Sequence, residues 1–209
     1  MKITFLGDSI RQQYAPVVNE ALGDKFEIWY PEDNCRFAKY TLRGLFEWQY
    51  LMEGTDIVHW NNGHWDVCDL LGDGSFSTEE EYIANMLRVL DVLQKRYKII
   101  IFATTTPVRK ENQFENNKAI ERFNDIIVPI LEERGVIIND LYGLLKGNEE
   151  KYICDDTIHL SKEGIDACAK QVTNYIIDAV NSINNKPGKN DKLQKNSTDY
   201  ANTGAPVLI

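Results

Sequence analysis

Residues 2–9 read Lys-Ile-Thr-Phe-Leu-Gly-Asp-Ser, an apolar run that ends in a glycine turn and a serine. Apolar residues then recur at helical spacing from Tyr14 to Leu22. A strand that turns directly into a helix begins a βα unit, the building block of parallel sheets. The stretch therefore predicts a strand over 2–6 and places Ser9 at its carboxyl end, where open parallel sheets bind ligands. The alternative is that Ser9 only caps the helix.

The rest of the chain repeats this alternation of short apolar runs and amphipathic segments, which predicts one α/β domain with a parallel sheet. Further strands are expected at 26–30, 56–60, 98–103 and 136–138. Helices are expected at 40–53, from about Thr78, at 116–134 and at 161–183. The domain is thus expected to span residues 1–183. From Asn184 the composition shifts to Asn, Lys, Asp and Ser, which predicts a flexible polar tail over 184–209.

Composition excludes several classes of partner. A net charge of −9 argues against a nucleic-acid-binding or anionic-membrane surface. The sequence lacks an apolar run of about 18 residues that would cross a membrane. Its four cysteines form no CxxC pair, so we expect free thiols and no metal site. If Met1 is the natural start, a cytoplasmic location is expected, although a longer exported precursor would leave the same sequence.

A second chemical motif lies near the other end of the domain, where residues 156–161 read Asp-Thr-Ile-His-Leu-Ser. A serine hydroxyl becomes a strong nucleophile when an imidazole removes its proton. That imidazole needs a carboxylate on its other nitrogen to fix its tautomer. Asp156 and His159 supply both groups from one short loop before the last helix. The alternative is a surface histidine with an aspartate that bonds local amides.

Four stretches together resemble the SGNH/GDSL hydrolases. They are the Phe-Leu-Gly-Asp-Ser of 5–9, residues 56–66, residues 136–142 and the 156–161 motif. The resemblance implies a flavodoxin-like three-layer α/β/α sandwich. It implies ester hydrolysis through an acyl-serine intermediate, without metal or cofactor. By analogy Ser9 attacks the ester, His159 acts as base and then acid, and Asp156 orients the imidazole.

The sequence departs from this family where the oxyanion hole is expected. The loop that normally offers a glycine N–H reads Glu-Asp-Asn-Cys-Arg-Phe at 32–37. Cys35 is our candidate for that position, because a backbone donor does not require a particular side chain. The alternative is that Cys35 is simply a small buried residue.

The family's third block normally supplies an asparagine amide to the oxyanion. Aligned on the glycine of Asn-Asn-Gly-His-Trp at 61–65, this chain has Trp65 in that place. Asn62 or Asn61 is therefore the candidate amide, acting from a shifted position. Arg11 and Gln12, soon after the serine, are further candidates, and a solvated helix charge is the alternative for Arg11.

Aromatic and imidazole side chains follow the third expected strand. Trp60, His64 and Trp65 are candidates for contacting a sugar, because flat rings suit the C–H faces of carbohydrates. The alternative is that the two tryptophans fill the core. His59, inside the strand, is expected to be structural.

Three functions are compatible with these motifs. The leading hypothesis is an esterase that removes a small acyl group, such as acetyl, from a carbohydrate or other small-molecule ester. An acyltransferase with the same triad is the second, because the Asn-Asn-Gly-His-Trp stretch is similar to that of plant polysaccharide O-acetyltransferases. A non-catalytic domain that binds a glycan or a protein is the third, because the oxyanion motifs are incomplete.

Overall fold

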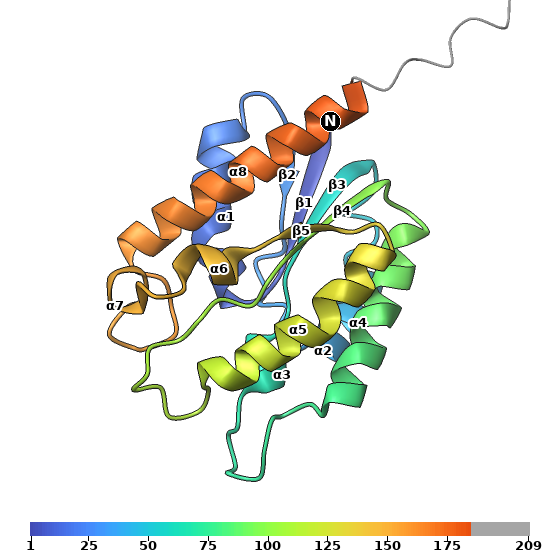
Figure 1. The fold of residues 1–209 in the computed structure, drawn as a ribbon. Coiled ribbons are helices and arrows are strands. Elements are labelled where there is room, and N and C mark those ends of the chain that lie inside the picture. The colour runs from blue at the N-terminus through green and yellow to red at the C-terminus, as the bar shows by residue number, and fades with distance from the viewer. Residues whose placement is uncertain (185–209) are drawn as a thin grey trace, which may run out of the picture.

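A parallel sheet forms the centre of the protein in the computed structural model, which describes residues 1–184 (Figure 1). Its strands run in the order β2-β1-β3-β4-β5, the flavodoxin-like order, which confirms the predicted fold class. Each strand lies within about one residue of its predicted position. The strands are β1 Lys2–Leu6, β2 Glu27–Trp29, β3 Thr55–Trp60, β4 Ile99–Ala103 and β5 Ile137–Asn139.

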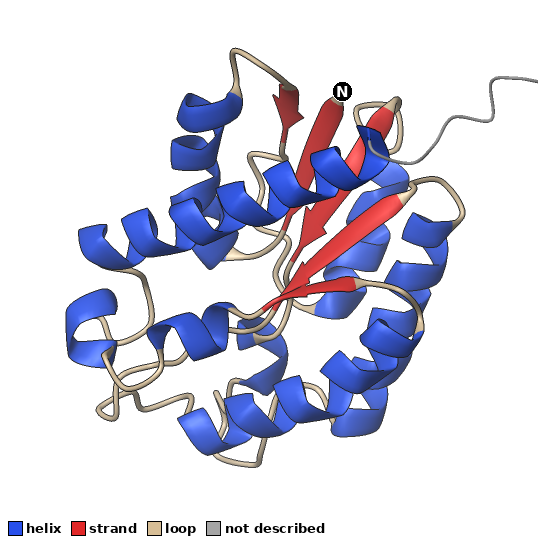
Figure 2. Cartoon of the chain, turned by 45° about the horizontal axis from the view of Figure 1, so that its top comes forward, coloured by secondary structure: helices blue, strands red, loops and turns tan. Residues whose placement is uncertain are grey.

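Helices cover both faces of the sheet (Figure 2). The first long helix and the last pack together on one face, and α2, α4 and α5 lie on the other. Three short helices, α3, α6 and α7, were not predicted. The helices are α1 Ser9–Leu22, α2 Ala38–Glu47, α3 His64–Val67, α4 Glu79–Gln94, α5 Asn117–Glu133, α6 Leu141–Leu145, α7 Glu149–Tyr152 and α8 Lys162–Asn184.

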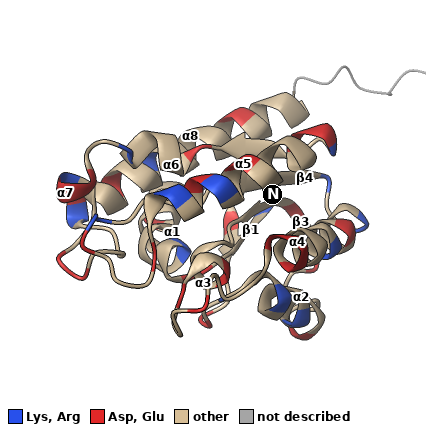
Figure 3. Cartoon of the chain, turned by 60° about the horizontal axis from the view of Figure 1, so that its bottom comes forward, with Lys and Arg blue, Asp and Glu red and all other residues tan. Residues whose placement is uncertain are grey.

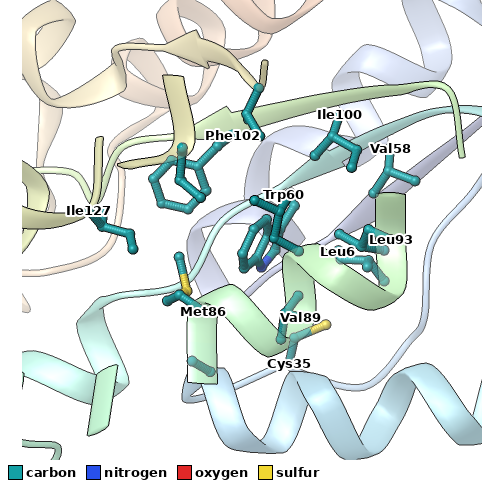
Figure 4. Close-up of a cluster of buried hydrophobic side chains, with 14 of the residues drawn as sticks. Leu6, Cys35, Val58, Trp60, Met86, Val89, Leu93, Ile100, Phe102 and Ile127 are labelled. Atoms are coloured by element: carbon teal, nitrogen blue, oxygen red, sulfur yellow. The ribbon is translucent and has the colours of Figure 1, made fainter. Parts of the chain in front are cut away.

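Two hydrophobic cores flank the sheet because strand side chains alternate between its faces. On β4, for example, Phe102 faces the α2/α4/α5 layer, whereas Ile101 faces the α1/α8 layer. Figure 4 shows the first of these cores, with the indole of Trp60 at its centre. The apolar runs predicted to be buried strands thus form the central layer of the sandwich.

The helix expected at 40–53 was placed wrongly. It begins at Ala38 and ends at Glu47. A Cβ on Gly44 would run into the ring of Trp48, so the absence of a side chain lets Trp48 fold back over the helix end. The aromatic side chains of Phe46 and Tyr50, within the predicted range, are 68% and 79% exposed.

The carboxyl ends of β1, β3 and β4 meet at one edge of the sheet. Leu6 pairs with Trp60, and Trp60 pairs with Phe102, so the residues that follow each strand lie side by side. This edge receives Gly7-Asp8-Ser9, the Asn-Asn-Gly-His stretch and the three threonines at 104–106. It is the edge at which open parallel α/β sheets bind ligands.

Some predictions concern the surface and the chain end. The polar tail was predicted to begin at Asn184. That residue belongs to helix α8, and the rest of the predicted tail lies outside the described residues. The four cysteines are free thiols. Within residues 1–184, no helix combines the length and apolarity that crossing a membrane requires. Acidic and basic residues are interspersed along the helices in the view of Figure 3.

Candidate active site

Ser9, His159 and Asp156 lie in hydrogen-bonding order at this edge. The Nε2 atom of His159 is 2.9 Å from Ser9 Oγ, and its Nδ1 atom is 2.8 Å from Asp156 Oδ2. Ser9 opens helix α1, while the other two residues belong to the loop between Ile153 and Leu160, which form an antiparallel bridge. The geometry is that of a nucleophile, a base and an orienting carboxylate.

The helix cap leaves the Ser9 hydroxyl free for this arrangement. Asp8, not Ser9, is the N-cap of α1, and its Oδ1 atom accepts the Ile10 N–H at 3.0 Å. The alternative interpretation of Ser9 as a capping residue is therefore wrong. The Asp8 carboxylate also accepts a bond from Asn61 Nδ2 at 2.9 Å, which ties the end of β3 to the serine turn.

The catalytic loop folds around the carboxylate of Asp156. Its Oδ1 atom accepts the N–H groups of Ile158 and His159 at 3.1 and 2.9 Å. Partial burial alone would raise the pKa of Asp156. The two N–H groups and the imidazole more than offset that effect and hold the pKa of Asp156 below its ordinary value. The carboxylate is thus kept ionised beside the imidazole.

The backbone N–H of Ser9 is a candidate oxyanion donor that was not predicted from the sequence. This N–H lies in the first turn of α1, where helix N–H groups have no intrahelical acceptor. It donates to no group within residues 1–184. The predicted position of Ser9 at the start of a helix already implied that its backbone N–H is free.

The prediction that Cys35 supplies a backbone donor is wrong. Its N–H donates to the Gly7 carbonyl at 3.0 Å and is therefore already used. Its thiol is completely buried, and burial raises the pKa of the thiol to about 11. Cys35 instead joins the loop after β2 to the serine turn, as a buried structural residue.

Asn62 is placed and fixed as an amide donor would be. Its Oδ1 atom accepts bonds from Thr41 Oγ1 at 2.9 Å and Trp60 Nε1 at 2.6 Å. Its Nδ2 atom donates one bond, of 2.7 Å, to the Arg36 carbonyl. The amide nitrogen keeps a second N–H for another acceptor. Because the oxygen is committed to two donors, the orientation of this amide is determined.

The neighbouring Asn61 is arranged differently. A Cβ on Gly7 would overlap its Oδ1 atom, so the glycine is required for the close approach of the two segments. The same Oδ1 atom and Asp8 Oδ2 are buried without a hydrogen-bond partner among the described residues. Unsatisfied buried polar atoms are rare, and they concentrate here beside the nucleophile.

The prediction that Arg11 holds the oxyanion is wrong. Its buried guanidinium donates to three backbone carbonyls, those of Gly7, Pro31 and Asp33, at 2.8 to 3.3 Å. It is neither a solvated helix charge nor an anion ligand, and it holds the loop after β2 against the serine turn. Gln12 similarly donates to the Glu32 carbonyl at 2.8 Å.

Two of the three predicted sugar contacts are also wrong. Trp60 is completely buried in the core (Figure 4). His64 is 3% exposed, and its ring nitrogens are occupied by Glu115 Oε2 at 2.6 Å and Thr106 Oγ1 at 2.9 Å. Trp65 is 37% exposed and remains available.

Trp65 belongs to a surface that we name the arginine–aromatic surface, made of Arg36, Tyr40 and Trp65. The guanidinium of Arg36 lies 4.7 Å from the centre of the Tyr40 ring and 5.9 Å from that of Trp65. Arg36 adjoins the Cys35–Gly7 contact, and its carbonyl accepts the Asn62 amide. The surface therefore borders the edge that holds Ser9.

His59 is structural, as predicted. It is completely buried in β3, and burial lowers the pKa of its imidazole to about 3. Within residues 1–184, no group of three or more His, Cys, Asp or Glu side chains is placed to hold a metal ion.

Comparison with known proteins identifies the fold. No family model and no curated protein matches the chain, whereas 68 chains of solved structures do. An acetyl xylan esterase is 21% identical, with a TM-score of 0.70, over 84% of this chain and 100% of its own. A GDSL-like lipase from Bacteroides thetaiotaomicron is 16% identical, with a TM-score of 0.67, over 85% and 88%.

A protein of carbohydrate esterase family 3 from Talaromyces cellulolyticus is 16% identical, with a TM-score of 0.65, over 87% of this chain and 99% of its own. At these identities the likeness concerns the fold. The parallel sheet, its two helical layers and these structural neighbours show that the chain has the SGNH/GDSL hydrolase fold.

Proposed function

We propose that the protein is a serine esterase that hydrolyses a small acyl ester through an acyl-Ser9 intermediate. The observation that carries the proposal is the continuous contact from Ser9 Oγ through both nitrogens of His159 to Asp156, with distances of 2.9 and 2.8 Å. These distances are within the range in which an imidazole can take a serine proton. The esterase and lipase names of the structural neighbours agree with this chemistry.

In the proposed mechanism, His159 removes the Ser9 proton as Oγ attacks the ester carbonyl. The imidazolium, stabilised by Asp156, then gives that proton to the leaving alcohol oxygen, which leaves an acyl ester on Ser9. A water molecule attacks the acyl carbon next, and His159 takes its proton and returns it to Ser9 Oγ. The products are the alcohol, the free acid and the unchanged enzyme.

The negative charge that develops on the carbonyl oxygen requires donors aimed at it. The Ser9 N–H and the second N–H of Asn62 are the two donors that we assign to this role. Each remains available after the hydrogen bonds of the described residues are accounted for. In the family's motif the asparagine amide aligns with Trp65 of this chain. Here Asn62 supplies the amide from a shifted position.

We further propose that the alcohol part of the ester is a carbohydrate, bound on the arginine–aromatic surface. A half-exposed indole next to a guanidinium offers a flat apolar face and charged donors at its rim, which suits sugar C–H groups and hydroxyls. Structural neighbours named as an acetyl xylan esterase and a carbohydrate esterase agree with this choice.

The first test is hydrolysis of p-nitrophenyl acetate, butyrate and octanoate by the wild type and by Ser9→Ala. We expect turnover of the acetate that disappears in Ser9→Ala, and labelling of Ser9 by a serine-directed phosphonate, measured by intact mass. Folded wild-type protein without turnover or labelling would refute the esterase, and a binding-only or acceptor-dependent function would replace it.

The sugar proposal needs a separate comparison. Trp65→Ala is expected to raise KM for acetylated xylo-oligosaccharides several-fold relative to KM for p-nitrophenyl acetate, because the p-nitrophenyl ester lacks the sugar rings. Phe46→Ala, which removes an exposed aromatic side chain from α2, is the matched control. An equal change for both substrates would remove Trp65 from the sugar site.

A further inference from the structure

The backbone of Thr157 is held in an unfavourable conformation inside the catalytic loop. Its φ of +75° lies in the left-handed region, where a β-branched residue is a strong exception. Thr157 follows Asp156 directly and precedes the two residues whose N–H groups bind that carboxylate. The direction of this backbone therefore sets how Asp156 meets His159.

Two residues of the segment after β4 hold Thr157 there. The Arg109 N–H donates to the Thr157 carbonyl at 2.9 Å, and Asn112 Nδ2 donates to Thr157 Oγ1 at 3.0 Å. The Arg109 guanidinium also bonds the Ile153 carbonyl at 2.9 Å and Asp155 Oδ1 at 3.0 Å. The catalytic loop is thus bound on both sides of Asp156 by residues outside it.

The side chain of Asn112 is itself held by hydrogen bonds from its own segment. Its Oδ1 atom accepts the N–H groups of Phe114 and Glu115 at 2.9 and 2.7 Å. The Glu115 carboxylate, 4% exposed, bonds the buried imidazole of His64. His64 comes two residues after Asn62. A continuous set of contacts therefore runs from the asparagine segment after β3, through the His64–Glu115 pair and Asn112, to the catalytic loop.

We propose that Asn112 is a positioning residue, which keeps Thr157 in its left-handed conformation and so aligns Asp156 and His159 with Ser9. The inference rests on the proposed esterase function for its kinetic consequence, but its structural content concerns the Asp156–His159 contact alone. Asn112 touches none of the three triad side chains in the described contacts. It acts through Thr157.

The kinetic test compares Asn112→Ala with Asn116→Ala. Asn116 lies on the same segment, caps α5 through a bond from the Ala119 N–H, and makes no hydrogen bond to the catalytic loop among the described residues. We expect Asn112→Ala to lower kcat about 10- to 100-fold with little change in KM, because small misplacements of reacting groups have effects of that size. Asn116→Ala should lower the melting temperature and leave kcat unchanged.

A double-mutant cycle tests whether Thr157 transmits the effect. Thr157→Val removes Oγ1 and keeps a β-branched side chain. In that background, Asn112→Ala should lower kcat by less than about twofold further, because contacting residues are non-additive. A full additional loss in the double variant, or an unchanged kcat in Asn112→Ala, would overturn the proposal.

A readout independent of turnover separates this inference from the esterase proposal. In protein with its three histidines isotopically labelled, we expect the NMR signal of the His159 Nδ1 proton to broaden or vanish in Asn112→Ala and to persist in Asn116→Ala. That result without Ser9-dependent turnover would keep the positioning role and refute the esterase. Turnover with an unchanged signal and kcat in Asn112→Ala would refute the positioning role.

Discussion

Two residues other than glycine have a left-handed backbone within residues 1–184; one is bonded to Asn62, and the other directly follows Asp156. They are Arg36, with a φ of +48°, and Thr157, with a φ of +75°. Such conformations cost about 1–3 kcal/mol each and persist where the surroundings determine them. Two hydrogen bonds constrain the backbone of Arg36. Its N–H donates to the Asn34 side chain, and its carbonyl accepts from the Asn62 amide. Backbone strain thus lies beside Asn62, our proposed oxyanion donor, and beside Asp156, the proposed acid of the triad.

At the scale of single residues, the two asparagines after β3 can be separated by mutation. Asn62→Ala is expected to lower kcat by roughly 10²- to 10³-fold, the usual effect of losing one oxyanion donor. Asn61→Ala should have the smaller kinetic effect, because we assign the oxyanion to the second N–H of Asn62, whereas the Asn61 amide holds the Asp8 carboxylate. Stopped-flow measurement of p-nitrophenyl acetate hydrolysis gives kcat for both variants.

The comparison of kcat requires that both variants are folded under the assay conditions. Asn62→Ala also removes the acceptor of the Trp60 indole N–H and the bonds to Thr41 and the Arg36 carbonyl, so its melting temperature is expected to fall. Activity is therefore compared per folded molecule, well below both melting temperatures. A larger kinetic loss in Asn61→Ala would transfer the oxyanion role to that residue.

At the scale of elements, Asp66 joins the starts of three helices. It lies in α3, its Oδ2 atom accepts the N–H of Ala38 at the start of α2, and its Oδ1 atom accepts the hydroxyl of Ser77, just before α4. The side chain of the N-cap residue of α2 makes no capping bond, so Asp66 caps this helix from a distance. Burial raises the pKa of Asp66 from 3.8 to about 6.

This raised pKa predicts a specific pH dependence. An acid with a higher pKa in the folded state binds more protons when folded, so its contribution to stability falls as pH rises from about 4 through about 6. Relative to Asp66→Asn, the unfolding free energy of the wild type should fall by roughly 2–3 kcal/mol between pH 3 and pH 7. Urea unfolding across that range measures it, and a difference that stays constant with pH would contradict the assignment.

The elements themselves were largely predictable, because buried parallel strands read as apolar runs and long helices as periodic ones. The proximity of Ser9, Asp156 and His159 could also be predicted, because each follows from a strand end or a short motif. Of the two oxyanion donors that we propose, Asn62 was a candidate from the sequence and the Ser9 N–H was not. The Cys35 candidate was wrong because its N–H is already bonded to Gly7, a contact that depends on tertiary structure. Nor does a sequence indicate that Asn112 supports Thr157, because left-handed φ angles and contacts 45 residues apart depend on tertiary structure.

At the scale of the whole molecule, a buried polar network joins the sheet to the α1/α8 layer. His59 of β3 lies 3.5 Å from the Tyr14 hydroxyl of α1, and its Nε2 atom lies 3.2 Å from Asn139 Nδ2 of β5. The Asn139 Oδ1 atom in turn accepts a bond from Gln171 of α8, at 2.9 Å. To accept a hydrogen bond from the Asn139 amide, the Nε2 atom of His59 must carry no proton. The folded state therefore requires an uncharged His59.

Acid is expected to destabilise the whole molecule through this histidine. Burial lowers the pKa of His59 from 6.5 to about 3, so protons bind the unfolded chain first as pH falls below 6.5. Relative to His59→Gln, the unfolding free energy of the wild type should drop by about 3 kcal/mol between pH 7 and pH 4. The sign is opposite to that at Asp66 in an overlapping pH range, so one set of urea titrations tests both. A wild type that gains stability over His59→Gln on acidification would show that the imidazole is charged in the folded protein.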